Sequence, residues 1–307
     1  MGTRMGMGMG MGMGTRMGTE MEMEMEMEMP DQIVDTTNGS ILQHGKLNDR
    51  IYLMKLSDKE TEHIIHEMEH LAALNDYSKI FCIVPPDVYP LFMSDRYLLE
   101  GYIPGFYRGE SDGLFVSKFR GNGERFHVPD NELAPFHQLL SDMKGKPKAP
   151  PVNTPRYMLR ELNKQDAKGI AHLYSEVFES YPFPIHDPGY IVKMMNEDVR
   201  YFGAFKGDEL AALSSAEVDP KERNAEMTDF ATSPRHAGNN LSLHLLSHME
   251  SAMKQQGICT LYTIARLLSL PMNKTFLRSG FTYSGTLRNN TQISGRIESM
   301  NLFYKQL

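Results

Sequence analysis

The sequence predicts an α/β (α+β) protein whose second half forms a mixed, twisted sheet flanked by helices. Short apolar runs of strand length alternate with amphipathic segments of helix length along most of the chain. A stretch with four prolines, residues 144–155, cannot form a helix or a central strand and therefore divides the chain. The order of strands and helices after this stretch recurs in part before it, which predicts two related halves.

Four segments are expected along the 307 residues. Residues 1–29 are a low-complexity tail of Met-Gly and Met-Glu repeats, and such a sequence cannot build a core. Residues 30–143 are expected to form an amino-terminal α/β domain, residues 144–155 a Pro-rich linker, and residues 156–307 a carboxy-terminal α/β domain. The length of the chain also favours two domains of ordinary size.

The composition argues against several classes of protein. The formal net charge is −7, and no block of Lys and Arg occurs, so nucleic acid is not an expected partner. No stretch approaches the roughly 18 to 20 apolar residues of a membrane helix, so no membrane association is expected. Cys82 and Cys259 lie far apart in apolar runs, as is typical of thiols in a reducing compartment. We therefore expect a cytoplasmic protein.

The elements of the second half follow from periodicity and from helix-breaking residues. Ile170, Leu173 and Val177 share one face of a predicted helix. Pro188 is typical of a first helical turn, and Gly257 is typical of a helix end. The expected order is strand 157–161, helix 164–178, loop 180–185, helix 188–195, hairpin 201–205 with 209–218, strand 226–232, helix 240–256, strand 260–265, helix 270–278, and strands 280–287 and 298–305.

The first half repeats the last part of this order. An apolar strand at 80–84 is followed by a short helix at 87–93 and by strands at 99–106 and 113–119. The repeat predicts that the first half is a partial copy of the second. The alternative is a coincidence between two α/β segments.

The segment between Thr232 and Leu246 is predicted to hold a phosphate. A strand ends there, the chain turns at Pro234, and a helix begins, so free backbone N–H groups converge at the positive end of the helix dipole. Gly238 permits a left-handed backbone and close approach of a ligand. The two asparagines that follow are the non-glycine residues that best tolerate this conformation.

The same segment resembles the GNAT family of N-acetyltransferases. Residues 237–242 occupy the place of the family's Q/R-x-x-G-x-G/A motif, although Ala237 replaces the Arg or Gln and Asn240 the first Gly. Ser269, Phe276 and Gly280-Phe281 stand where members carry Asn, Tyr and a Gly-aromatic pair. The resemblance implies a GNAT fold that binds acetyl-CoA as co-substrate through backbone groups, without a metal. Phe276 cannot protonate the departing thiolate as a Tyr would.

The chain also resembles one subfamily, the β-lysine N-acetyltransferases of methanogenic archaea and some bacteria. The resemblance lies in residues 225–232, 272–276, 285–290 and 298–305, and in residues 100–106 of the first half. It implies transfer of acetyl to the ε-amine of β-lysine, which gives the osmolyte Nε-acetyl-β-lysine. Two alternatives stay open: another small amine or a protein amine as acceptor, and a non-catalytic acyl-CoA-binding module.

The resemblance implies that an amine attacks the thioester directly in a ternary complex, so the site must accept a proton from an ammonium whose pKa is near 10. Glu226 and Asp229 are three residues apart on one predicted strand and are expected to face opposite sides, with one of them at the substrate cleft. Glu226, grouped with Phe230, is favoured as the base, directly or through water. Asp229 is a candidate for substrate binding. The alternative for either carboxylate is an ion pair with a neighbouring arginine.

The other candidates follow from the resemblance as well. Glu298 and Tyr304 share a face of the last strand and are candidates for substrate binding and proton relay. Arg266 and Arg288 are candidates for the carboxylate of β-lysine, or else ordinary surface arginines. The first half is expected to flank the acceptor cleft or to make the contact of a homodimer. Contacts with the coenzyme are expected from Phe230, Ala231, Thr232, Ala237, Gly238, Asn239, Asn240, Leu241, Ser242, Asn273 and Phe276.

Residues 66–70, His-Glu-Met-Glu-His, have the form of the zinc peptidase motif H-E-x-x-H. At helical spacing Ile64, Met68 and Ala72 define an apolar face, and His66 and His70 fall nearly opposite it. This pattern favours a solvated helix face over a zinc site, and no metal is expected.

Overall fold

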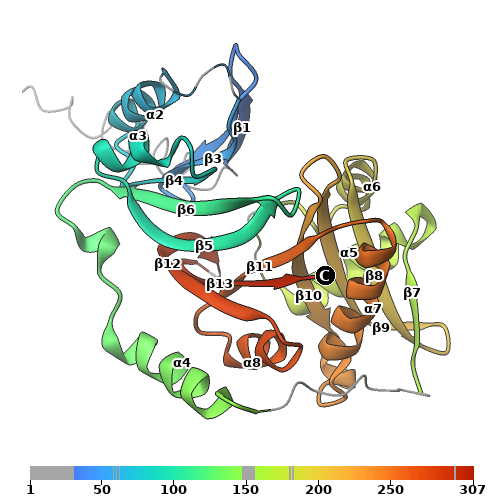
Figure 1. Cartoon of the computed structure of the whole chain (residues 1–307). Helices are drawn as coiled ribbons and strands as arrows, with labels where there is room; N and C mark the ends of the chain where they lie inside the picture. The colour runs from blue at the N-terminus through green and yellow to red at the C-terminus, as the bar shows by residue number, and fades with distance from the viewer. Residues whose placement is uncertain are drawn as a thin grey trace, which may run out of the picture.

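The structure is a computed structural model of the whole chain and describes residues 31–57, 59, 61, 63–146, 156–179, 181, 183–293 and 295–307. The predicted low-complexity tail and most of the predicted linker lie outside the described residues. The described strands form one 13-stranded sheet, in the order β1-β2-β3-β4-β6-β5-β12-β13-β11-β10-β9-β8-β7. Figure 1 shows the two halves of the chain sharing this sheet.

The second half supplies seven neighbouring strands of the sheet. All neighbouring pairs among them are antiparallel except β10 with β11, which is parallel. A parallel pair needs a crossover, and helix α7 provides it. The strands are β7 (Met158–Glu161), β8 (Val199–Lys206), β9 (Glu209–Asp219), β10 (Asn224–Thr232), β11 (Thr260–Arg266), β12 (Thr282–Ile293) and β13 (Arg296–Gln306).

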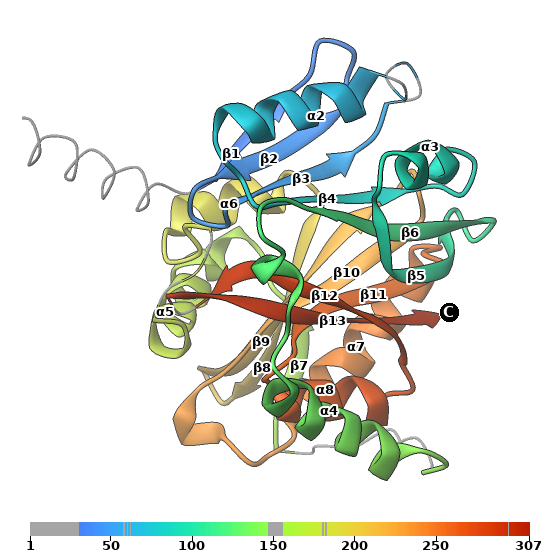
Figure 2. The ribbon, with the colours of Figure 1, turned by 90° about the vertical axis from the view of Figure 1, so that its left-hand side faces the viewer.

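Helices cover both faces of this part of the sheet. One face packs against α7 (Leu241–Gln255) and α8 (Leu270–Arg278), in a core that includes Leu245, Met249 and Phe276. The other face packs against α5 (Ala167–Val177), which follows the short 3₁₀ turn η2 (Lys164–Asp166), and against α6 (Pro188–Met195). Figure 2 shows α5 and α6 on one side of the strands and α7 and α8 on the other.

The first half forms the other six strands. Its elements are β1 (Gln32–Asp35), β2 (Ile41–Gly45), β3 (Arg50–Lys55), α2 (His63–Leu74), β4 (Lys79–Val84), α3 (Tyr89–Ser94), β5 (Leu98–Tyr107), β6 (Ser111–Phe119), η1 (Glu124–Phe126) and α4 (Asp130–Met143). Helices α2 and α3 cover one face of strands β2, β3 and β4, with Ile51, Met68 and Phe92 in the core between them. The opposite face of these strands carries none of the described helices of the first half.

The strand order of the first half repeats that of the second. The run β2-β3-β4-β6-β5 corresponds to β9-β10-β11-β13-β12, and the parallel pair β3 with β4 corresponds to β10 with β11. Helix α2 makes the crossover of the first pair as α7 makes that of the second. These correspondences support a partial copy of one fold, although the division into two domains stays a proposal.

Strands β5 and β12 join the halves at a pair of glycines. Gly101 lies opposite Gly285, and a Cβ on Gly285 would stand 2.0 Å from the backbone oxygen of Glu100. Beside this joint the buried side chains of Lys79 and Glu100 form an ion pair at 2.9 Å, and both also bind the backbone of Arg288. The two halves are therefore held together by backbone pairing and by a buried polar contact.

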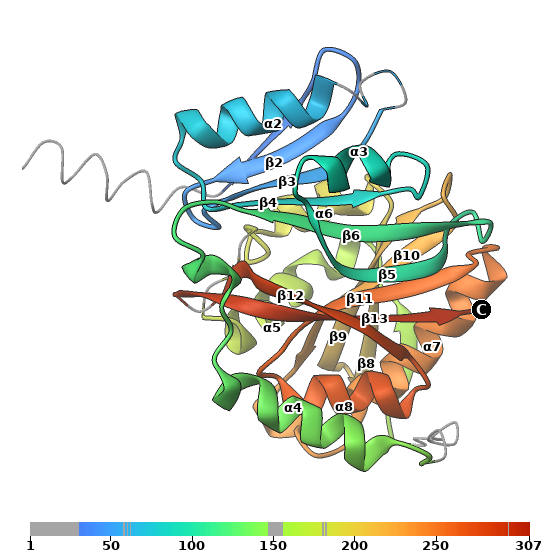
Figure 3. The ribbon, with the colours of Figure 1, turned by 60° about the vertical axis from the view of Figure 1, so that its left-hand side comes forward.

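Helix α4 follows the first half in the chain but packs on the second. Its Phe136 is fully buried, with ring centroids 5.0 Å from Tyr283 and 6.1 Å from Phe303. Figure 3 shows α4 beside α8 along the edge of the second half. The sequence interpretation assigned no helix to this segment, which Pro135 interrupts, although Leu133, Phe136, Leu140 and Met143 recur at helical spacing.

Candidate active site

A large cavity of about 1360 Å³ lies between the two halves. The helix-free face of the first half forms part of its wall, and α6 with the strands of the second half forms the rest. The residues that carry its chemistry are Arg50, Tyr52, Tyr181, Tyr190, Glu217, Glu226, Asp229, Tyr262 and Asn290. Of the residues predicted from sequence as functional, the cavity contains Glu226 and Asp229.

A β-bulge in β10 brings both of these carboxylates to the cavity. The register with β9 shifts between Thr228 and Ala231, and Asp229 adopts a left-handed backbone with φ 55°. The expectation that Glu226 and Asp229 face opposite sides is therefore wrong, because the extra residue cancels the alternation of the strand. Phe230 accordingly packs on the other face, with its ring centroid 5.6 Å from that of Phe276.

Glu226 stands in a row of polar side chains that crosses three strands. Its cross-strand neighbours are Glu217 on β9 and Tyr262 on β11. Enclosure by the cavity walls, the charge of Glu217 and the charge of Asp229 raise the pKa of Glu226 well above its usual value. Glu217 stays open to water on the cavity wall, yet the same enclosure and the charge of Asp229 raise its pKa to about 7.

Asp229 is held by hydroxyl groups. It accepts hydrogen bonds from Tyr181, from Ser215 at 2.7 Å and from Thr228 at 3.3 Å. Enclosure raises the pKa of Asp229, and these hydrogen bonds oppose the rise. Three carboxylates thus converge on one wall, which is an arrangement that attracts a cation.

The sheet opens beside these carboxylates. Asn224, Ala225 and Glu226 pair with Thr260, Leu261 and Tyr262, and the ladder between β10 and β11 stops there. The edge of residues 230–232 that faces away from β9 therefore has no partner in this ladder. An extended ligand with amide groups fits such an opening, since it can replace the missing strand contacts.

The turn between β10 and α7 has the geometry that the sequence predicts. It contains the 3₁₀ turn η3 (Pro234–His236), then Gly238 with φ 80° and Asn240 with φ 54°. Asn240 is the N-cap of α7, and no side chain among the described residues caps this terminus. The side-chain amide of Asn239 donates to the carbonyl of His236 at 2.9 Å, so this side chain stabilises the turn and its donor is not free for a ligand. The first amides of α7 are thus suited to an anion.

Asn273 and Phe276 are structural residues, contrary to the expectation that they contact the coenzyme. The Asn273 side chain is fully buried; it donates to the carbonyls of Arg266 and Ser269 and accepts from Asn301 at 2.9 Å. The Phe276 ring stacks on Phe303 inside the core. Both side chains are already satisfied within the protein.

The expected substrate contacts of Arg266 and Glu298 are also wrong. The two side chains bind each other through two hydrogen bonds of 2.8 and 2.7 Å, and Arg296 also binds Glu298. These contacts leave Glu298 no free oxygen for an amine and occupy the guanidinium fork of Arg266.

Arg288 and Tyr304 also lie outside the cavity lining. The Arg288 guanidinium stacks 4.3 Å from the ring centroid of Phe126. Tyr304 lies two strands away from Glu226, with Tyr262 between them in the register, and enclosure raises the pKa of its phenol. Neither residue is brought to the carboxylates.

The sequence interpretation missed the residues that the first half contributes. Arg50 and Tyr52 lie on β3, for which no strand was predicted, so nothing placed them near the second half. Glu217 carried a signal, because it is an acidic residue that directly follows the apolar run of β9. Tyr181 and Tyr262 had no signal beyond their residue type.

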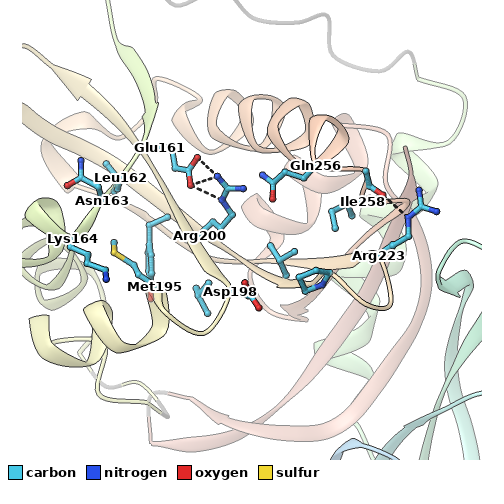
Figure 4. A pocket seen from close by; sticks show the side chains of 15 residues that line it. Glu161, Leu162, Asn163, Lys164, Met195, Asp198, Arg200, Arg223, Gln256 and Ile258 are labelled. Atoms are coloured by element: carbon cyan, nitrogen blue, oxygen red, sulfur yellow. Dashed lines mark hydrogen bonds and ion pairs between the residues drawn. The ribbon is translucent and has the colours of Figure 1, made fainter.

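A smaller pocket of about 590 Å³ lies where β8 begins and β9 ends, beside the ends of β7 and α7. Figure 4 shows its side chains, among them Glu161 and Arg200, which bind each other in a bidentate ion pair of 2.7 and 2.6 Å. Arg223 binds the carbonyl of Gly257. The two arginines of this pocket are thus engaged with the protein, and it contains no residue predicted as functional.

The structure also describes the segments considered for a zinc site and for membrane helices. His66 and His70 are exposed on α2, as predicted, and Glu69 between them forms ion pairs with Lys118 and Arg120. Within the part of the chain that the structure describes, no group of three His, Cys, Asp or Glu side chains is placed to hold a metal ion. None of the described helices is long and apolar enough to cross a membrane.

The chain is similar to several known proteins. Residues 168–281 match the model of the acetyltransferase (GNAT) family. A β-lysine N6-acetyltransferase of Methanococcus maripaludis is 38% identical over 273 residues, which are 87% of this chain and 96% of that protein. The N-acetyltransferase YodP of Bacillus subtilis is 30% identical, with 87% of this chain and 96% of that protein covered. The spermidine N-acetyltransferase of Vibrio cholerae in complex with CoA and spermine is 17% identical, with a TM-score of 0.44, and covers 50% of this chain and 96% of its own.

The mixed sheet, the crossover helix after a bulged strand and the family match define an acetyltransferase fold, which confirms the predicted fold class. The chain belongs to the GNAT family, in the group that contains the β-lysine N6-acetyltransferases, and it is an N-acetyltransferase.

Proposed function

We propose that the protein transfers acetyl from acetyl-CoA to the ε-amine of β-lysine, with Glu226 as the base. The observation that carries the proposal is the convergence of Glu217, Glu226 and Asp229 beside the opening between β10 and β11. Three carboxylates in one enclosed wall favour a cationic acceptor. The names of the relatives give β-lysine as the first acceptor to test.

The carboxylates account for the proton chemistry of the transfer. An ammonium enters beside Glu226 and gives it a proton, which a carboxylate with a raised pKa accepts more readily than an ordinary one does. The neutral nitrogen attacks the thioester carbon, and the C–S bond breaks as the C–N bond forms. The nitrogen's second proton passes to the sulfur. The products are the acetylated amine and free CoA.

The coenzyme is proposed to bind along the opening of the sheet. The pantetheine amides pair with the free backbone edge of Phe230, Ala231 and Thr232, and the pyrophosphate accepts hydrogen bonds from the amides of Gly238, Leu241 and Ser242. Together these contacts direct the thioester toward Glu226. Asp229, fixed by Tyr181 and Ser215, is proposed to bind the acceptor ammonium.

The test is an assay of the full chain with acetyl-CoA and a panel of amines. We expect CoA release and an acetylated product with β-lysine, located at the ε-nitrogen by fragmentation in mass spectrometry. Slower turnover is expected with α-lysine and spermidine. A faster reaction with spermidine would assign a different acceptor. Binding of acetyl-CoA without turnover on any amine would support a non-catalytic module instead.

A further inference from the structure

Arg50 is a buried cation in the wall of the cavity, supplied by the first half. Its side chain lies over the ring of Tyr52, with the guanidinium carbon 5.3 Å from the ring centroid. One terminal nitrogen donates to the carbonyl of Asn290 at 2.5 Å and to the Thr291 hydroxyl at 3.2 Å. The residue is 5% exposed, yet its Nε is buried without a hydrogen-bond partner among the described residues.

Asn290 presents a second unpartnered atom beside the first. Its side chain is 2% exposed and lines the same cavity, and its Oδ1 has no hydrogen-bond partner in the described part of the chain. The 2.5 Å contact between Arg50 and the Asn290 carbonyl places the two residues side by side. A buried donor and a buried acceptor without hydrogen bonds are costly. Their presence together in a cavity wall therefore points to a ligand that bonds to both.

The surroundings of Arg50 favour an anionic partner. Burial lowers the pKa of the guanidinium, while the charges of Asp31 and Tyr52 oppose the effect. The Asp31 carboxylate is itself bound by the side-chain amide of Asn48 at 2.7 Å. A carboxylate on the ligand would offset the desolvation of Arg50 and accept from its Nε.

We propose that Arg50 and Asn290 form a subsite for the head of the acceptor, in which Arg50 binds the carboxylate and Asn290 the adjacent ammonium. The proposal rests on the proposed function, because it concerns the part of β-lysine that does not react. β-Lysine carries a carboxylate and an amine two carbons apart at one end and its ε-amine at the other. The ring of Tyr52 lies against Arg50, and Tyr52 and Glu226 line the same cavity.

This arrangement assigns the first half a role in specificity. The second half provides the reacting groups and the coenzyme contacts. Strand β3 of the first half provides the positive charge of Arg50, which binds a carboxylate, a group that a polyamine lacks. An acceptor without a carboxylate leaves Arg50 Nε unpaired, and a site that is left with an unpaired buried group rejects such an analogue strongly.

Two analogues of β-lysine separate the two contacts. Putrescine is β-lysine without its carboxymethyl arm, and 6-aminohexanoate is β-lysine without the β-amine. The values of kcat/KM, or Ki where an analogue is not acetylated, are measured for the parent, Arg50→Gln and Asn290→Ala. For Arg50→Gln we expect a loss of roughly 10- to 100-fold with β-lysine and 6-aminohexanoate, and little change with putrescine. For Asn290→Ala we expect the loss with β-lysine and putrescine and little change with 6-aminohexanoate.

The outcomes distinguish the subsite from the proposed function. A parent enzyme that does not acetylate β-lysine overturns the proposed function and the subsite with it. If a variant loses kcat/KM equally on all three compounds, or loses none with β-lysine, the subsite is overturned and the proposed function stands. Thermal unfolding of each variant is measured alongside. If Arg50→Gln does not fold, the selectivity of Asn290→Ala decides, because that change removes an oxygen with no partner among the described residues and only a long hydrogen bond of 3.4 Å to Thr291.

Discussion

Glu226 on β10 lies directly opposite Glu217 on β9, so two carboxylates stand next to each other on the wall of one cavity. Like charges in neighbouring cross-strand positions destabilise a sheet. A protein keeps such a pair where the charges are used, and here they stand where the parallel strands part. The pair therefore relates the sheet to the chemistry: enclosure and mutual repulsion make each carboxylate a better proton acceptor.

Replacement of the proposed base is the first prediction. Glu226→Gln keeps the shape of the side chain but cannot take a proton, so we expect kcat/KM for the acceptor to fall by about 10²- to 10⁴-fold. The affinity for acetyl-CoA, measured by calorimetry, should change little. Glu110→Gln, at an exposed position of the first half, serves as the control and should retain full activity. A Glu226→Gln enzyme with parental kcat/KM would assign the base elsewhere.

The pH profile gives the second prediction. A base must be ionised to accept a proton, so kcat/KM should fall as the pH drops through the raised pKa of Glu226. In Glu217→Gln a neutral amide replaces the neighbouring charge, the pKa of Glu226 decreases, and the acidic limb of the profile should move to lower pH. Steady-state rates between pH 5 and pH 9 test this shift. An unmoved limb, or a move to higher pH, would show that Glu217 does not act on the base.

The fold was predictable from sequence where the local pattern decides the structure. Helix α8 begins at Leu270 and ends at Arg278, as predicted, because Pro271 opens it and its apolar spacing is regular. The turn at Gly238 was predictable because Pro234 and Gly238 are residue types that favour a turn. Strands β1 to β3 were missed, since their short runs mix polar and apolar residues and are stabilised by pairing with one another and, through β3, with β4.

The site was less predictable than the fold, for two physical reasons. The bulge at Asp229 is set by backbone geometry, and no residue type near it predicts an extra residue in the strand. The contribution of Arg50 depends on how the two halves meet, through contacts with Asn290 that span 240 positions of the chain. Conversely, Arg266 and Glu298 had residue types suited to a substrate, but strands β11 and β13 bring them to each other.

The amino terminus of α7 gives the third prediction. Ser242→Glu adds a carboxylate to the first turn, where it should stabilise the helix by about 0.3–1 kcal/mol and repel a pyrophosphate. We therefore expect the KM for acetyl-CoA to rise roughly 10-fold or more while thermal stability is kept or increased. Ser251→Glu, near the other end of the same helix, is the matched control and should leave this KM unchanged. A normal KM in Ser242→Glu would mean that the coenzyme phosphates bind elsewhere.

The joint between the halves gives the fourth prediction. At Gly285 a methyl group would stand 2.0 Å from the backbone oxygen of Glu100 and 2.8 Å from the Cα of Gly101, so β5 and β12 must move apart to admit it. Gly285→Ala should lower the free energy of unfolding by about 1–3 kcal/mol, in the range of other overpacked positions. The control is Gly169→Ala in α5, where the nearest atom to the new methyl is 3.9 Å away. There the same change should raise stability by about 0.5–1 kcal/mol, because alanine favours a helix. Urea denaturation of both variants measures the difference, and equal stabilities would contradict the close approach of the two strands. Because the cavity lies between the halves, Gly285→Ala should also raise the KM for the acceptor, whereas Gly169→Ala should not.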